Sequence, residues 1–256
     1  MLNIAHRGNS AVAPENTLAA FESAARGGAQ MIETDIHVCA SGEIVVIHDD
    51  DVATTTNGTG QVMKLPWAAL KNLDAGSWFS PAFAQQRIPL LADLLEFYQH
   101  HPKLELLLEF KGDWPLVEVA RAVAQVEGAQ LRERTILESF SVITMTNLAE
   151  IAPGFRRGLL VDDFPSGTPP EQRSRELVEK IIEARRLGVH FLNPSVELVK
   201  AHPELVARSH QAKLEVHVWT ADHPADFAHL SALRVDGICT NRPGFLAGWL
   251  AGRQPS

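Results

Sequence analysis

The chain has 256 residues, of which 45% are hydrophobic and 21% are charged, and its formal net charge is −8. This length and composition suit one large α/β domain, expected over residues 1–256, or at most two small ones. The acidic charge argues against general binding to nucleic acid or to an anionic membrane surface, because both need a positive surface field.

The first elements along the chain predict a strand, a helix and a second strand. Residues 2–5 form a short apolar run that stops at His6-Arg7-Gly8, as a buried strand does when it ends in a polar loop. Residues 14–17 open a helix, which Asn16 or Thr17 can cap and which Gly27-Gly28 ends. We expect its inner face to carry Leu18, Phe21 and Ala25. The order strand, helix, strand implies a parallel sheet with a right-handed crossover.

The second strand, expected over residues 32–38, carries two carboxylates. Because side chains alternate along a strand, Glu33, Asp35 and His37 point to one face. Two close carboxylates repel each other unless a positive charge lies between them, and a hard divalent cation commonly supplies it. The alternative is an amphipathic strand with a solvated polar face. After a turn, residues 43–48 form a second short strand that ends on His48.

Regular periodicity lapses between residues 49 and 89. This stretch is rich in Asp, Thr, Gly, Ser and Pro, with one short helix expected over residues 66–73. An insertion of this length inside a compact domain is usually functional. We expect it to cover one end of the sheet.

Strands and helices then alternate to the end of the chain. Helices are expected over residues 90–99, 115–126, 142–151, 173–187, 224–232 and 243–252, with another ending near His210. Strands are expected over residues 103–110, 135–138, 157–161, 189–192, 213–220 and 235–240. With the first two, this gives eight strands in near-regular alternation, which favours a TIM (β/α)8 barrel with a small insertion after the second strand. An open doubly wound sheet is the alternative, but no G-x-G-x-x-G turn follows the first strand.

No targeting or membrane-spanning segment is evident. The N-terminus lacks a signal-peptide pattern, and no apolar run has the length of a bilayer-spanning helix, so we expect a cytoplasmic protein without membrane insertion. Cys39 and Cys239 lie far apart without a C-x-x-C spacing, which favours unlinked thiols. The sequence does not indicate an oligomeric state.

In a barrel of this kind the active site lies where the strands end, so the residues that close each strand are the candidates. The third strand ends on Glu109 and Lys111, which share a parity and face the interior. With Glu33 and Asp35, Glu109 makes three oxygen donors, a set suited to Mg²⁺ or Ca²⁺. The same parity argument turns Glu138, Asn193 and His217 toward the interior.

These strand-end residues suit the cleavage of a phosphodiester. A metal and the cations Arg7 and Lys111 would neutralise the phosphate, while His6 and His48 would move protons to and from the reacting oxygens. Each residue also has a structural interpretation in isolation. His6 could cap a helix, Lys111 could pair with Glu109, and Trp219 could belong to the core.

The motifs together resemble the signature of the glycerophosphodiester phosphodiesterase family, and they occur in order from residue 6 to residue 243. They are His6-Arg7-Gly8, Pro14-Glu15-Asn16-Thr17 with Phe21, Glu33-x-Asp35, Val45-Val46-Ile47-His48-Asp49, Glu109-x-Lys111, Trp219-Thr220 and Val235-Asp236-Gly237-Ile238. The resemblance implies a TIM barrel that hydrolyses glycerophosphodiesters, such as glycerophosphocholine or glycerophosphoethanolamine, to sn-glycerol 3-phosphate and an alcohol with one divalent cation, Mg²⁺ or Ca²⁺. The family pattern assigns Glu33, Asp35 and Glu109 to the metal, His6 and His48 to acid/base catalysis, Arg7 and Lys111 to the phosphate, and Trp219 to the glycerol moiety.

Two departures and several alternatives remain at this stage. Thr54 stands where the family often carries arginine, and Cys39 stands where it tends to carry threonine. The same site could act on lysophospholipids or release a cyclic phosphate, although the lack of an apolar membrane-binding stretch argues against lipid substrates. The attacking group could be water or the glycerol 2-hydroxyl. A non-catalytic ligand-binding barrel is a further hypothesis, but it has no use for a second histidine.

Overall fold

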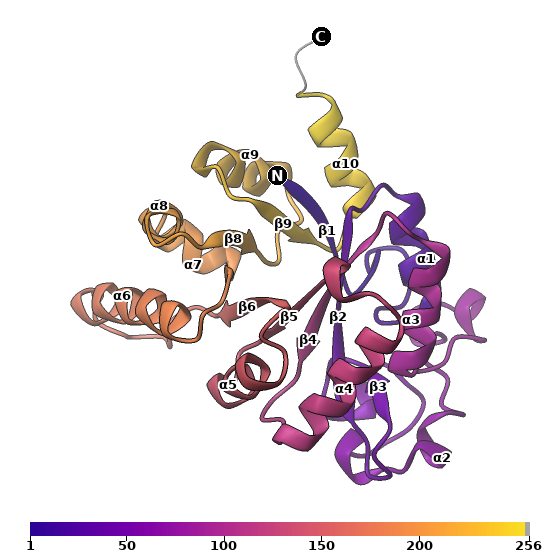
Figure 1. Ribbon diagram of the computed structural model, residues 1–256. Coiled ribbons are helices and arrows are strands. Elements are labelled where there is room, and N and C mark those ends of the chain that lie inside the picture. The colour runs from indigo at the N-terminus through magenta and orange to yellow at the C-terminus, as the bar shows by residue number, and fades with distance from the viewer. Residues whose placement is uncertain (254–256) are drawn as a thin grey trace.

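Eight parallel strands form a closed ring in the structure, a computed structural model that describes residues 1–253 (Figure 1). The last three residues of the domain expected over 1–256 therefore lie outside the described residues. The ring consists of β1 (Leu2–His6), β2 (Met31–Val38), β4 (Glu105–Phe110), β5 (Thr135–Ser139), β6 (Arg156–Val161), β7 (Phe191–Pro194), β8 (Glu215–Val218) and β9 (Gly237–Thr240). Because β1 pairs with both β2 and β9, the sheet closes on itself. The (β/α)8 barrel is thus confirmed, and the open doubly wound sheet was the wrong alternative.

The helices surround the ring on its outer side, except α2, which lies in the insertion beside β3 (Figure 1). They are α1 (Leu18–Arg26), α2 (Trp67–Leu70), α3 (Leu91–His100), α4 (Leu116–Gly128), α5 (Val142–Ile151), α6 (Pro170–Arg186), α7 (Val196–Ala201), α8 (Glu204–Gln211), α9 (Pro224–Leu233) and α10 (Pro243–Ala251). None of the helices within residues 1–253 is both long and apolar enough to cross a membrane.

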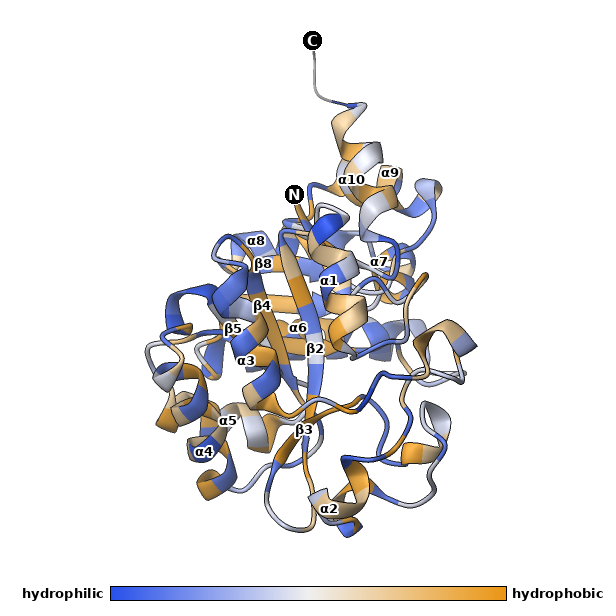
Figure 2. Cartoon of the chain, turned by 90° about the vertical axis from the view of Figure 1, so that its right-hand side faces the viewer, coloured by the Kyte–Doolittle hydropathy of each residue, from blue (hydrophilic) through white to orange (hydrophobic). Residues whose placement is uncertain are grey.

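Side chains alternate along the barrel strands, so apolar residues pack on both the outer and the inner face of the barrel. On β4, Leu106, Leu108 and Phe110 pack outward in the large core under the helices, whereas Leu107 points inward to a small cluster with Ile4 and other residues. Glu109 shares the parity of Leu107 and therefore points into the barrel. Figure 2 shows β4 as largely apolar beside a hydrophilic stretch of β2.

Thr17 caps α1, as one of the two expected alternatives, and its hydroxyl accepts a hydrogen bond from the backbone N–H of Ala20. The predicted inner face is right for Phe21, which is fully buried, but wrong for Leu18, which is 41% exposed. Ala20 and Ala24 share the buried face with Phe21, and Ala25 is half-buried at its edge. Leu18 lies about 100° of helical rotation away from that face.

Several expected elements in the second half of the chain differ from the structure, and β8 and β9 each start two residues later than expected, at Glu215 and Gly237. The helix expected to end near His210 is two helices, α7 and α8, because Pro203 has no N–H to continue α7 and disfavours helical geometry at His202. β7 starts at Phe191 rather than Val189, because the Val189 N–H is bonded to the carbonyl of Ala184 at the end of α6.

The insertion carries a small core of its own. β3 (Ile44–Val46) pairs antiparallel with β2, and Val46 donates a backbone hydrogen bond to Pro89, so the insertion leaves and rejoins the barrel at one place. Between these points lie α2, shorter than the expected helix over 66–73, and the 3₁₀ turns η1 (Val52–Thr54), η2 (Val62–Lys64) and η3 (Pro81–Phe83). Val52, Val62 and Leu70 pack with Cys39 beside the C-terminal end of β2. Both cysteines are buried and free, as expected.

Candidate active site

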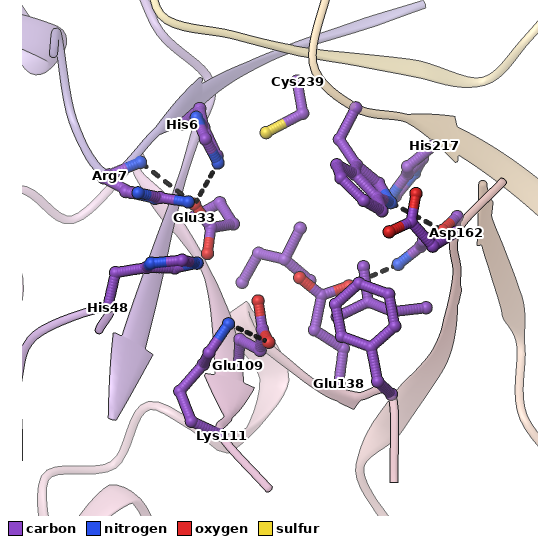
Figure 3. A pocket seen from close by; sticks show the side chains of 15 residues that line it. His6, Arg7, Glu33, His48, Glu109, Lys111, Glu138, Asp162, His217 and Cys239 are labelled. Carbon is purple, nitrogen blue, oxygen red and sulfur yellow. Dashed lines mark hydrogen bonds and ion pairs between the residues drawn. The ribbon is translucent and has the colours of Figure 1, made fainter. Parts of the chain in front are cut away.

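A cavity of about 330 Å³ lies at the C-terminal ends of the barrel strands (Figure 3). Its lining includes seven of the eight predicted site residues: His6, Arg7, Glu33, His48, Glu109, Lys111 and Trp219. The eighth, Asp35, is fully buried and lies within 3.5 Å of both Arg7 and Lys111. No residue described between 49 and 89 lines the cavity, so the insertion flanks the site and does not cover it.

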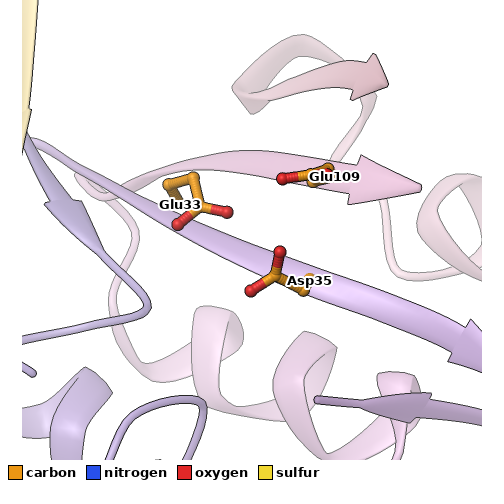
Figure 4. A group of neighbouring side chains, drawn as sticks. All are labelled: Glu33, Asp35 and Glu109. Atoms are coloured by element: carbon orange, nitrogen blue, oxygen red, sulfur yellow. The ribbon is translucent and has the colours of Figure 1, made fainter. Parts of the chain in front are cut away.

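The three carboxylates lie together, as their strands require. Asp35 on β2 is directly opposite Glu109 on β4, and Glu33 is two residues before Asp35 on the same face. One oxygen from each side chain lies within 4.8 Å of the others (Figure 4). All three side chains are at least nine-tenths buried.

Three ionised carboxylates in such a buried place repel one another, and the protein responds unequally. Arg7 and Lys111 hold the pKa of Asp35 well below its usual range, against the opposing effect of desolvation. Desolvation and the negative charge of Asp35 raise the pKa of Glu109 to about 8, and they raise the pKa of Glu33 strongly as well. Oε1 of Glu33 and Oδ1 of Asp35 are buried without a hydrogen-bond partner among residues 1–253. This donor set, with unpartnered oxygens, fits a hard divalent cation.

Arg7 and Lys111 are held in place by acidic side chains. Arg7 follows β1 in a left-handed turn, with φ 55° at Arg7 and φ 87° at Gly8, where a Cβ would lie 2.7 Å from Ala20. This turn lets the backbone N–H of Arg7 donate to Glu33 Oε2 at 3.0 Å, while its guanidinium donates to Glu15 at 2.8 Å. Lys111 Nζ lies 2.8 Å from Glu109 Oε1 and 3.5 Å from Asp35 Oδ1. The pairing of Lys111 with Glu109 that was considered as its structural interpretation is therefore present at the cavity wall.

His6 has a defined tautomer. Asn241 donates its side-chain N–H to Asp222 Oδ2 at 2.6 Å, so its Oδ1 faces His6 and accepts from Nδ1 at 2.7 Å. The proton of the neutral ring is then on Nδ1, and unprotonated Nε2 lies 4.0 Å from Glu33 Oε2. Desolvation and the nearby Arg7 charge lower the pKa of His6 to about 4.

His48 has a carboxylate partner instead. Its Nδ1 lies 2.5 Å from Oδ1 of Asp49, so the ring can donate a hydrogen bond to that carboxylate and its orientation is fixed. Although desolvation opposes it, interactions with Thr54 and His48 lower the pKa of Asp49. Thr54 thus contacts the partner of His48. His37, which shares the parity of the carboxylates on β2, hydrogen-bonds to the carbonyl oxygen of His48 at 3.0 Å.

The rest of the cavity wall is partly aromatic. Trp219 packs edge to face against Phe140, with ring centroids 5.5 Å apart, and its indole N–H donates to the carbonyl of Asn193 at 2.8 Å. Glu138, Asn193 and His217 also line the cavity, as their parity predicted.

Sequence reasoning missed the residues that support the site from behind. Asn16 donates to Asp35 Oδ2 at 2.9 Å, Glu15 binds Arg7, and the pair Asn241 and Asp222 orients His6. Their position was the available signal, because Asn241 directly follows β9 and Asn16 stands in the loop after β1.

Comparison with known proteins agrees with this geometry. Residues 6–245 match the Glycerophosphoryl diester phosphodiesterase family. A glycerophosphodiester phosphodiesterase of Caldanaerobacter subterraneus is 34% identical over 94% of each chain. The crystal structure of a glycerophosphodiester phosphodiesterase from Agrobacterium tumefaciens superposes with a TM-score of 0.79 at 29% identity, covering 96% of this chain and 98% of that one. A phosphodiesterase of Oleispira antarctica, solved in complex with the product sn-glycerol-3-phosphate, superposes with a TM-score of 0.78 at 26% identity over 97% and 96% of the two chains. The chain therefore belongs to the glycerophosphoryl diester phosphodiesterase family of enzymes.

Proposed function

We propose that this protein hydrolyses glycerophosphodiesters to sn-glycerol 3-phosphate and an alcohol, using one divalent cation and two histidines. One observation carries the proposal: two histidines, Arg7, Lys111 and two carboxylates from separate stretches of sequence line a single cavity, and Asp35 lies directly behind its wall. The family and the product bound to the Oleispira antarctica relative support the same reaction.

Glu33, Asp35 and Glu109 would hold the cation, Mg²⁺ or Ca²⁺, through oxygen ligands. When bound, it would stabilise negative charge on the phosphate oxygens. Arg7 and Lys111 would bind the same phosphate, Arg7 through its planar guanidinium and Lys111 as a point charge.

The two histidines differ in their partners, which suits them to different proton transfers. Asn241 keeps the proton of neutral His6 on Nδ1, so Nε2 is free to remove a proton from the attacking hydroxyl or water. Asp49 accepts a hydrogen bond from Nδ1 of His48 and orients the ring, which would donate a proton to the leaving alcohol.

The test is release of sn-glycerol 3-phosphate from glycerophosphocholine by the purified protein. We expect turnover that stops with a chelator and returns with Mg²⁺ or Ca²⁺. A folded sample that releases no product under any ion would contradict the proposal. Turnover of lysophospholipids alone would move the substrate assignment to lipids.

A further inference from the structure

A second polar group lies on the wall of the cavity away from His6 and His48. It consists of Glu138 on β5, Asn193 on β7 and His217 on β8, each only 1% exposed. Figure 3 shows Glu138 and His217 across the cavity from the two catalytic histidines. The mechanism above gives these three side chains no role.

Several atoms of this group have no partner within the described residues. Oδ1 of Asn193 and both ring nitrogens of His217 are buried without a hydrogen bond. A neutral histidine offers one donor and one acceptor, and Asn193 Oδ1 is an acceptor. Buried polar groups in proteins are almost always paired, so unpaired ones in a cavity wall indicate a ligand or water that pairs with them.

Glycines on neighbouring strands make room for these side chains. A Cβ at Gly158 on β6 would lie 2.6 Å from Nδ2 of Asn193, which crosses that position to donate to Glu138 on β5. A Cβ at Gly237 on β9 would lie 2.7 Å from Cδ2 of His217. Glycine inside a strand weakens it and often marks a place where another group approaches closely. The barrel is therefore built around this polar group.

We propose that Glu138, Asn193 and His217 form a subsite for the free hydroxyl groups of the glycerol moiety, and in particular for its primary C1 hydroxyl. The inference rests on the proposed function. A hydroxyl can donate to Asn193 Oδ1 and also accept from the ring N–H of His217. A phosphate finds no cation in this group and meets the carboxyl of Glu138. An ammonium group cannot accept a hydrogen bond, so it would leave the ring N–H of His217 unpaired.

The experiment compares two ligands by titration calorimetry with the metal-loaded protein. They are sn-glycerol 3-phosphate and the matching enantiomer of 2-hydroxypropyl phosphate, which lacks only the C1 hydroxyl and keeps the C2 hydroxyl. We expect the wild type to bind the first about 10- to 100-fold more tightly. In His217→Phe, which keeps a ring against Phe191 and removes both nitrogens, the ratio should fall toward one. The control is His100→Phe on the outer side of α3, which should keep the wild-type ratio.

The wild-type ratio decides the inference even if His217→Phe does not fold. Equal affinity for the two ligands would overturn the subsite and would mean that water alone pairs with these atoms. Turnover of glycerophosphocholine is measured on the same sample. Tighter binding of sn-glycerol 3-phosphate without turnover would support the subsite and contradict the proposed hydrolysis. Turnover with equal affinity for the two ligands would support the hydrolysis and contradict the subsite.

Discussion

Replacing Glu109 by glutamine should stabilise the metal-free protein and abolish its response to metal. Desolvation and Asp35 raise the pKa of Glu109 from its usual 4.5 to about 8. At pH 7 the folded metal-free protein therefore binds a proton that the unfolded chain does not, at a cost of about 3 kcal/mol for the roughly 2.5 pH units between 4.5 and 7. Glutamine has the same shape and no charge, and its oxygen can still accept from Lys111.

The same shift fixes the pH dependence of the wild type without metal. Because the folded-state pKa of Glu109 is raised, its contribution to the free energy of unfolding is fully present below about pH 4.5 and is lost as the pH rises through about 8. The slope is at most about 1.4 kcal/mol per pH unit for this group. Glu33 shifts in the same direction and steepens the loss. The pKa of Asp35 is lowered, so its stabilising contribution is present above its usual pKa of 3.8 and is lost only as the pH falls below that value.

Thermal unfolding with a chelator, and then with Mg²⁺ or Ca²⁺, measures these effects. At pH 7 and without metal, Glu109→Gln should melt about 6 to 12 °C above the wild type, and metal should raise the melting temperature of the wild type only. The control is Glu96→Gln, an exposed residue on α3, which should change neither quantity. The reasoning would be refuted if Glu109→Gln melted below the wild type in chelator. It would also be refuted if metal raised the melting temperature of the variant as much as that of the wild type.

Three further outcomes are expected. His6→Ala and His48→Ala should each lower kcat by about 10²- to 10⁴-fold with an unchanged circular dichroism spectrum, and retained activity in either would sink the assignment of the acid/base pair. Asn241→Leu should lower kcat by about 10- to 100-fold with little change in KM, because the His6 tautomer is no longer fixed. A rise in KM with unchanged kcat would instead assign Asn241 to substrate binding. Calorimetry with a chelator should show binding of sn-glycerol 3-phosphate weakened at least about tenfold, and unchanged affinity would separate phosphate binding from the three carboxylates.

The barrel and the cavity residues could be predicted because both follow from local patterns. Strand periodicity turns Glu33, Asp35 and Glu109 inward, and the closed parallel topology brings strand ends together. The break between α7 and α8 had a local signal in Pro203 that the helical pattern obscured. The exposure of Leu18 had a signal too, since the spacing of Ala20, Phe21 and Ala24 already defines one helix face.

The supporting contacts could not be predicted in the same way. Asn241 reaches His6 across 235 positions of sequence, and Asn193 reaches Glu138 only because the intervening strand carries Gly158. Such contacts depend on side-chain rotamers and on the shape left by neighbouring residues, and periodicity contains neither. A strand glycine opposite a polar residue is a usable signal only after the strand order is known.

The position of the charges explains how an acidic chain can bind an anionic diester. The net charge of −8 acts over the whole surface, but a phosphate in the cavity responds mainly to charges within a few ångströms. There, Arg7 and Lys111 are held by ion pairs with Asp35, and both positively charged side chains line the cavity. A divalent metal ion bound by the three carboxylates would offset their negative charge. The carboxylates thus hold Arg7 and Lys111 in place, and the bound metal ion would leave these two side chains free to attract a phosphate.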